Sequence, residues 1–277
     1  MITIDENNVV YIPYDDERMN REFFYFLEAK GKSHGISKYN FIIKYYQQDV
    51  FYKAELELLQ NSEIFEKIVL NRIKYLSKSV DELTSEDILQ GFKRSGIHYG
   101  YGHFNPLWIK WFYQRYNIKT CYDPCGGWGH RILGSLDLDL YIYNDLSPTV
   151  YKNVNRIIHD FKLECITKTY NNDARTFIPI EDFEAMYTCP PYYNLEHYEC
   201  GDFADMNDYN NFIDSLFNVF YSKESCKIFG LMIREDLLPD KYKNKCSESF
   251  CLDVNRSKHI SKGGKHIKQE YVYIFKK

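Results

Sequence analysis

A glycine-rich turn is the first place in this 277-residue chain where the residue types could bind a ligand. The segment Asp123–Gly129 reads D-P-C-G-G-W-G and stands between a stretch typical of a strand and one typical of a helix. Glycines there let the backbone approach a ligand closely and adopt positive φ angles. A strand-to-helix turn of this kind lies at the carboxyl edge of a parallel sheet, where nucleotide-like ligands bind.

An acidic residue at the end of the next expected strand strengthens this interpretation. Asp145 stands there in Y-N-D-L, at a spacing from the turn that suits a carboxylate hydrogen-bonded to both ribose hydroxyls. Ile132 occupies the place of the third glycine of dinucleotide-binding turns, and the turn lacks the Lys/Ser pair of phosphate loops. The pattern therefore predicts a ligand that carries adenosine without phosphates, and S-adenosyl-L-methionine meets that description.

A second candidate segment, Thr188–Glu196, follows the fourth expected strand and reads T-C-P-P-Y-Y-N-L-E. Two prolines fix the backbone so that a carbonyl group points into a cleft instead of into a strand ladder. The aromatic residue beside them can stack on a flat base, which is worth about 1–3 kcal/mol. Both segments belong to the same edge of the sheet, so we expect them to face a common ligand site.

Together the two segments resemble the signatures of the amino-directed, S-adenosylmethionine-dependent DNA methyltransferases, which modify adenine N6 or cytosine N4. The family pairs a D-P-x-x-G-x-G turn with a later (D/N/S)-P-P-(Y/F/W) tetrapeptide, found here at Asp123–Gly129 and Cys189–Tyr192. The variety T-S-P-P-Y-F-N-L-E, typical of phage and bacterial DNA modification enzymes, is similar to T-C-P-P-Y-Y-N-L-E here. The resemblance runs from about Asn105 to the C-terminus.

The resemblance implies a role for each matching position. Asp145 would contact the ribose and Asp173 the adenine amino group, while the Pro190 carbonyl and residue 189 would hold the target amino group. Tyr192 would stack on a flipped-out base. The implied cofactor-binding residues are Phe104, Asn105, Asp123, Pro124, Gly127, Gly129, Asp145, Leu146, Asp173 and Ala174. The implied catalytic residues are Cys189, Pro190, Pro191 and Tyr192. The expected contacts to DNA are Tyr193, Asn194, Glu196, Lys262 and Lys265.

Cys189 departs from the family pattern, because a thiol is a weaker hydrogen-bonding group than Asp, Asn or Ser. Direct transfer to adenine N6 is the expected reaction, with the Pro190 carbonyl carrying more of the contact. The alternatives are transfer to cytosine N4, attack of a Cys189 thiolate in carbon-5 methylation with Glu196 or His197 as base, an RNA or protein acceptor, and an inactive accessory subunit that binds the cofactor.

Composition limits the class of protein and its partners. The chain is 44% hydrophobic and 27% charged, and no apolar run approaches the roughly 20 residues that span a bilayer. The start lacks a secretory signal and none of the eight cysteines has zinc-ligand spacing, so we expect a cytoplasmic protein without a metal or a membrane partner. The stretch from Lys241 to Lys277 is strongly basic although the net charge is -4. It is either a phosphate-binding face or a solvated rim.

The elements that must position these residues change in character along the chain. Residues 1–95 carry apolar spacings of three and four, which predict helices near 16–30, 38–60 and 62–78 and a further short helix that begins at Thr84. This region would recognise DNA, bind a partner or simply cover one face of the sheet, and the oligomeric state is open. Residues 96–277 alternate between strands and helices, which predicts a doubly wound, mostly parallel α/β sheet with an antiparallel terminal hairpin. The resemblance makes this a Rossmann-like methyltransferase domain. The expected strands are 119–122, 140–143, 164–168, 184–188, 226–233, 249–254 and 270–275.

Overall fold

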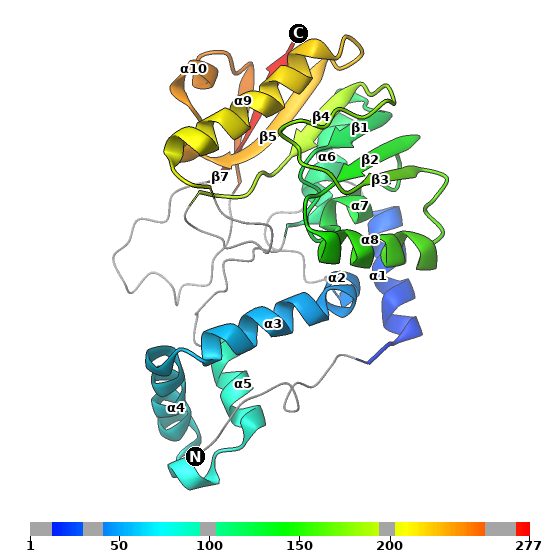
Figure 1. Cartoon of the computed structure of the whole chain (residues 1–277). Helices are drawn as coiled ribbons and strands as arrows, with labels where there is room; N and C mark the ends of the chain where they lie inside the picture. Colours follow the sequence, from blue (N-terminus) through cyan, green and yellow to red (C-terminus); the bar gives the residue numbers. More distant parts are fainter. Residues whose placement is uncertain (1–12, 30–40, 95–103, 194–202, 253–269) are drawn as a thin grey trace. The chain divides into compact units, whose positions relative to one another are not determined.

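The computed structural model describes residues 13–29, 41–94, 104–193, 203–252 and 270–277 (Figure 1). Within these ranges the chain divides into two compact units, one drawn from residues 15–46 and 102–277 and the other from residues 1–14 and 47–101. The division differs from the predicted boundary near residue 95, because residues 15–46 belong with the sheet.

A seven-stranded sheet forms the centre of the larger unit within the described residues. Its order is β3-β2-β1-β4-β5-β7-β6, and β7 is antiparallel to both of its neighbours while the remaining pairs are parallel. The mostly parallel sheet with a terminal hairpin confirms the predicted fold class. The strands are β1 (Thr120–Asp123), β2 (Leu140–Asn144), β3 (Thr167–Tyr170), β4 (Ala185–Thr188), β5 (Ile228–Arg234), β6 (Glu248–Leu252) and β7 (Glu270–Lys276).

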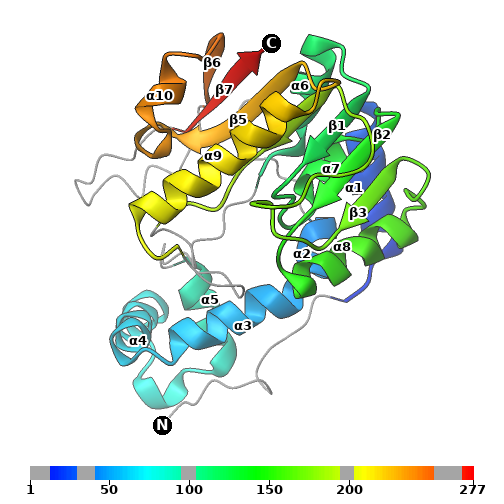
Figure 2. The same ribbon diagram turned by 45° about the horizontal axis from the view of Figure 1, so that its top comes forward.

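Helices cover both faces of this sheet (Figure 2). Alternate strand residues point to opposite faces, so Cys121 and Tyr141 join the core with α6, α7 and α8, whereas Tyr122 and Ile142 join the core with α9. The bounds are α6 (Pro106–Tyr116), α7 (His130–Gly134), α8 (Pro148–Asp160), α9 (Met206–Ser222) and α10 (Asp240–Lys243).

Helix α1 (Asp16–Glu28) is anchored to the sheet unit through a buried lysine. Lys110, on α6, donates hydrogen bonds of 2.8 Å to the carbonyl oxygens of Phe26 and Leu27. These carbonyls belong to the last turn of α1, where helical partners are missing. The lysine also pairs with Asp137 at 3.1 Å, so its buried charge is compensated.

Helix α2 (Phe41–Tyr46) docks beside it through two polar contacts. The Glu22 carboxylate of α1 accepts the backbone N–H groups of Phe41, at 2.6 Å, and Ile42, at 3.3 Å. At the other end of α2, the Tyr46 hydroxyl donates to Asp160 at the end of α8 at 2.6 Å. These contacts place α1 and α2 in the same unit as the sheet.

The smaller unit is built from α3 (Gln48–Leu59), α4 (Ser62–Leu76) and α5 (Ser85–Arg94). Thr84 caps α5 as the sequence predicts: its hydroxyl accepts the Asp87 N–H at 3.2 Å, and the Asp87 carboxylate accepts the Thr84 N–H at 3.1 Å. The core of the unit includes Leu59, Ile68, Leu83 and Ile88.

Two element boundaries differ from the predictions. The helix predicted over 38–60 includes a break at Gln47, where α2 ends and α3 begins. Strand β3 begins at Thr167 and not near 164, because Lys162 adopts a left-handed φ of 56° and a turn from Leu163 to Ile166 precedes the strand. Among the described residues, no helix has the length and apolarity to cross a membrane.

Candidate active site

The loops that follow β1, β2 and β3 are held together by one buried amide. Asn144, the last residue of β2, donates to the carbonyl oxygens of Pro124 and Asn172 at 3.0 and 2.9 Å, and accepts the Asn172 N–H at 3.0 Å. The carboxyl ends of these neighbouring strands therefore form one rigid edge. Asn144 was not predicted from the sequence, because its importance comes from its complete burial.

The glycine turn is bound directly to Asp145. Gly127 has a φ of 58°, which favours glycine, and its N–H donates to Asp145 Oδ2 at 2.8 Å. A Cβ added at Gly127 would meet, among described residues, only Arg131 Nη2 at 3.9 Å. The space beside Gly127 is therefore open to a ligand.

The other two glycines of the turn have packing roles. Gly129 has a φ of 94°, and a Cβ there would lie 3.2 Å from Val154 and 3.3 Å from Ile157, both on α8. A Cβ at Gly126 would overlap the Tyr143 ring at 2.0 Å. Gly129, which the sequence predicts to bind the cofactor, also fits the turn against α8.

Asp145 keeps hydrogen-bonding capacity for a ligand. Its carboxylate accepts the N–H groups of Gly127 at 2.8 Å and Ser147 at 3.0 Å, one on each oxygen. A carboxylate has about four acceptor positions, so two remain. Burial raises the pKa of Asp145, and its two backbone N–H partners oppose that shift. Leu146, beside it, is exposed. This geometry fits the predicted contact to two ribose hydroxyls.

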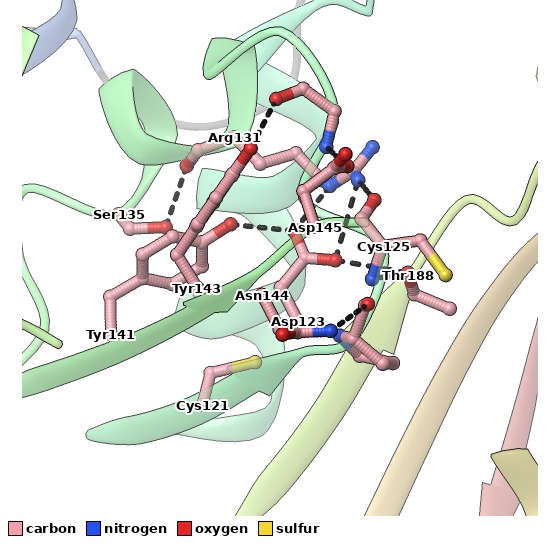
Figure 3. Close-up of polar contacts among 12 residues, drawn as sticks. Cys121, Asp123, Cys125, Arg131, Ser135, Tyr141, Tyr143, Asn144, Asp145 and Thr188 are labelled. Atoms are coloured by element: carbon pink, nitrogen blue, oxygen red, sulfur yellow. Dashed lines mark hydrogen bonds and ion pairs between the residues drawn. The ribbon is translucent and has the colours of Figure 1, made fainter. Parts of the chain in front are cut away.

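Asp123 is enclosed in a buried ionic network (Figure 3). One carboxylate oxygen lies 2.5 Å from Arg131 Nε and 2.5 Å from the Tyr141 hydroxyl, and the other accepts from Thr188 at 2.9 Å. The side chain is 1% exposed. Arg131 Nη2 also donates to the second oxygen at 3.3 Å, so four hydrogen bonds fill the roughly four acceptor positions of this carboxylate. The predicted contact between Asp123 and a cofactor stays a prediction.

The partners of Asp123 were not identified from the sequence. Tyr141 and Thr188 are ordinary strand residues, and Arg131 interrupts the short apolar helix H-R-I-L. The only signal is that a charged residue stands where the helix faces the sheet. Arg131 also donates to the Cys125 carbonyl, so it connects Asp123 to the glycine turn.

The loop after β3 places Asp173 and Ala174 at the same edge. Arg175 pairs with Asp173, with Nη2 2.7 Å from Oδ2, and this hydrogen-bonded arginine lowers the pKa of the carboxyl. Asp173 is partly exposed and Ala174 is buried. A partly exposed, ionised carboxylate suits the predicted hydrogen bond from an adenine amino group.

The C-P-P-Y segment follows β4 and is tied to the glycine turn by Thr188. The Thr188 hydroxyl oxygen accepts the N–H of Cys125 at 3.1 Å while it donates to Asp123. Within the segment, the Cys189 thiol lies 3.8 Å from the Tyr192 hydroxyl. The structure thus brings both signature segments together, as expected for parallel strands whose carboxyl ends share an edge.

Tyr192 is 5% exposed and belongs to the core beside α9. Its ring is therefore packed against protein, and base stacking by Tyr192 stays a prediction. Tyr193 is partly buried, with its ring centroid 6.1 Å from that of Tyr209. Pro190 is buried and Pro191 is partly buried.

Phe104 and Asn105 lie at the start of α6. The Asn105 side chain accepts the Leu107 N–H at 3.1 Å and caps the helix. The Phe104 ring lies 5.4 Å from the Arg131 guanidinium carbon and 6.2 Å from the Tyr187 ring. Phe104 thus borders the ionic network, and the Asn105 side-chain oxygen already accepts a hydrogen bond from α6. The predicted contacts of both residues with the cofactor stay predictions.

Four predicted contacts lie outside the described residues: Asn194, Glu196, Lys262 and Lys265. The described residues on either side of 253–269 show where this basic segment joins the sheet. Leu252 pairs with Glu270, which pairs with Arg234 at the carboxyl end of β5. The basic segment therefore leaves and re-enters the sheet at the same edge as the glycine turn. Within the described part of the chain, no three His, Cys, Asp or Glu side chains are grouped to bind a metal ion.

No protein-family profile matches the chain, and no curated protein matches its sequence. Among solved structures, human methyltransferase 10 domain containing protein aligns at 8% identity and a TM-score of 0.45 over 61% of this chain and 80% of that one. TrmN from Thermus thermophilus aligns at 16% identity and a TM-score of 0.43, over 64% of this chain and 50% of TrmN. A protein of the NADB-Rossmann superfamily from Streptococcus agalactiae aligns at 12% identity and a TM-score of 0.39, over 57% of this chain and 62% of that one.

At these identities and TM-scores the matches carry no function over to the chain. Its own strand order, with the antiparallel β7 between β5 and β6, shows a doubly wound, mostly parallel Rossmann-like sheet.

Proposed function

We propose that the chain transfers a methyl group from S-adenosyl-L-methionine to the exocyclic amino group of a base in DNA, with adenine N6 as the target. The observation that carries this proposal is the link between the two signature segments. Thr188 joins the C-P-P-Y segment to the backbone of the glycine turn at 3.1 Å, and Gly127 in that turn is bound to Asp145. A methyl donor and an amino group bound by these segments would lie side by side.

The residues present fit the cofactor. Among the described residues, the space beside Gly127 is open and two acceptor positions of Asp145 stay unused, which suits ribose hydroxyls. Asp173 offers a carboxylate to the adenine amino group. When bound, S-adenosylmethionine supplies a methyl group on a positively charged sulfur. No phosphate-binding pattern is needed for such a ligand.

The C-P-P-Y segment would orient the acceptor. A base amino nitrogen conjugates its lone pair with the ring, and acceptors that bind its two hydrogens favour the state in which the lone pair is available. The Pro190 carbonyl is such an acceptor, and the Cys189 sulfur is a weak one. Most of the rate enhancement would come from alignment and from these fixed acceptors.

Nucleic acid as the partner is supported by charge. Residues 253–269 contain five Lys/Arg residues (Arg256, Lys258, Lys262, Lys265 and Lys268) and a single acidic residue, Asp253. Both ends of this segment join the sheet at the edge that carries the proposed site. Basic side chains there would neutralise phosphates, which makes binding dependent on salt.

The test is incubation of the purified chain with methyl-labelled S-adenosylmethionine and unmethylated genomic DNA, followed by nucleoside mass spectrometry. We expect labelled N6-methyladenine. Total RNA and a protein extract are parallel acceptors, and an Asp145→Ala variant is the control for cofactor-dependent labelling. Label in RNA or protein alone would overturn the DNA proposal. Cofactor binding by calorimetry with no label in any acceptor would favour an accessory subunit.

A further inference from the structure

The Arg131 guanidinium has hydrogen-bonding capacity that the described residues of the protein do not use. An arginine has five N–H donors in a planar fork. In Arg131, Nε donates to Asp123 Oδ2, and Nη2 donates to Asp123 Oδ1 and to the Cys125 carbonyl. The two N–H groups of Nη1 have no hydrogen-bond partner among the residues that the structure describes.

The guanidinium lies beside the open side of the glycine turn, with Nη2 nearest to it. Arg131 Nη2 is the atom that a Cβ at Gly127 would approach, at 3.9 Å, and the Phe104 ring flanks the guanidinium at 5.4 Å. Figure 3 shows Arg131 extending from α7 past Asp123 toward Cys125 and Asp145. The guanidinium therefore lies next to the glycine turn, which is proposed to bind the cofactor.

The surroundings make this arginine a fixed donor. Its side chain is 6% exposed, and Asp123 orients the fork through two of its nitrogens. In such a shielded site a hydrogen bond to a charged group is stronger than in water, and little side-chain entropy is left to lose. The Asp123 carboxylate is bound on both oxygens and cannot serve as the ligand's partner without losing Arg131, Tyr141 or Thr188.

We propose that Arg131, through Nη1, binds the carboxylate of the methionine part of S-adenosylmethionine. This rests on the proposed function, because it assigns a residue to one chemical group of that cofactor. A planar guanidinium matches a carboxylate better than any other side chain. Asp123 then acts as the positioning residue that holds Arg131 in place.

The test compares S-adenosylmethionine with decarboxylated S-adenosylmethionine, which lacks only the carboxylate. Calorimetry on the full chain should show that the decarboxylated compound binds about 10-fold or more weakly, as expected for loss of a hydrogen bond between charged groups. Arg131→Met should bind the two compounds about equally. The ratio of the two dissociation constants is insensitive to a general loss of stability, because such a loss weakens the binding of both compounds alike.

Arg115→Met is the matched control. Arg115 pairs with Glu248 at 3.0 Å near the end of α6 that leads into β1, away from the carboxyl edge, so its removal should leave the discrimination unchanged. Circular dichroism checks that each variant is folded. If Arg131→Met does not fold, Arg131→Lys, which keeps the charge but loses the fork, should show a smaller ratio than the unaltered chain.

Equal affinity of the unaltered chain for both compounds would overturn the inference. The inference would also be overturned if Arg131→Met, or Arg131→Lys where that variant replaces it, preferred S-adenosylmethionine over the decarboxylated compound as strongly as the unaltered chain does. In each of these cases S-adenosylmethionine still binds, so the proposed function is untouched. A chain that binds neither compound would overturn the proposed function itself.

Discussion

At the scale of single residues, the Asp123–Arg131 pair determines how rigid the glycine turn is. A buried ion pair costs desolvation energy, and it is tolerated when further hydrogen bonds satisfy both groups. Here the Tyr141 and Thr188 hydroxyls donate further hydrogen bonds to the Asp123 carboxylate, and the Cys125 carbonyl accepts one from Arg131. The pair therefore positions the glycine turn as well as satisfying two buried charges.

Removing one member of this pair should be costly. In Asp123→Asn the positive charge of Arg131 stays buried without compensation, so we expect a loss of about 3–5 kcal/mol in the free energy of unfolding. Urea denaturation measures it. The double variant Asp123→Leu/Arg131→Met should recover part of the loss, because neither charge remains. A single variant that loses less than about 1 kcal/mol would show that the pair behaves like an exposed one.

Cys189→Ser separates direct transfer from nucleophilic attack. The serine oxygen is a better acceptor than sulfur, so direct transfer should be kept or raised by up to about 10-fold in kcat, the value of one hydrogen bond. A thiolate nucleophile would instead lose activity altogether. The measurement is methyl transfer to DNA under saturating cofactor. Cys165→Ser, at an exposed cysteine between α8 and β3, should behave like the unaltered chain.

The residues of the site differ in how well the sequence predicted them. The glycine turn and Asp145 have local patterns, since turn glycines and a strand-end acid can be identified from neighbouring letters. Arg131, Asn144 and Thr188 have none: their importance comes from burial and from partners on other strands. Thr188, for example, contacts Asp123 across 65 positions of sequence.

At the scale of elements, local chemistry explains the helix starts and long-range contacts explain the docking. Ser147 caps α8 by accepting the Val150 N–H at 3.2 Å, as its place before Pro148 predicts. The docking of α1 was not predictable, because Lys110 lies 84 residues from Phe26 and nothing in the α1 sequence indicates it. The late start of β3 follows from the left-handed Lys162, which a propensity argument does not foresee.

Helix α5 should weaken in acid. Lys78, at 2.8 Å, and the Thr84 N–H lower the pKa of Asp87 from 3.8 to about 2. The unfolded chain takes up this proton at higher pH than the folded chain does. The stabilising contribution is therefore complete well above pH 3.8 and disappears as the pH falls to about 2. The difference in melting temperature between the unaltered chain and Asp87→Asn, followed by circular dichroism, should shrink over this range. A constant difference would contradict the assignment.

At the scale of the whole molecule, the unit that contains the sheet is discontinuous in sequence. Residues 15–46 complete it, and residues 47–101 form an insertion-like second unit. The described helices of that second unit carry no excess of basic residues: residues 47–94 contain seven Lys/Arg and nine Asp/Glu. Their charge therefore does not favour contact with phosphates, and binding of a partner protein through these helices stays a prediction.

Two deletions test this organisation. A fragment of residues 96–277 lacks Phe26, Ile42 and Ile43, which are buried in the full chain, and should aggregate and fail to bind S-adenosylmethionine. A chain in which residues 48–94 are replaced by a flexible Gly/Ser linker keeps α1 and α2 and should bind with near-normal affinity. Calorimetry and size-exclusion chromatography measure both. A soluble, cofactor-binding 96–277 fragment would show that α1 and α2 are dispensable.

The hydrogen bond between Tyr46 and Asp160 has a consequence for biosynthesis. The two residues are 114 positions apart, and a ribosome adds about 5–20 residues per second. Helix α2 would therefore be synthesised roughly 6–23 s before its partner on α8. During this interval its apolar face, with Ile42 and Ile43, is exposed on the nascent chain. A chaperone that binds apolar segments could therefore bind α2 during this interval, before the sheet exists.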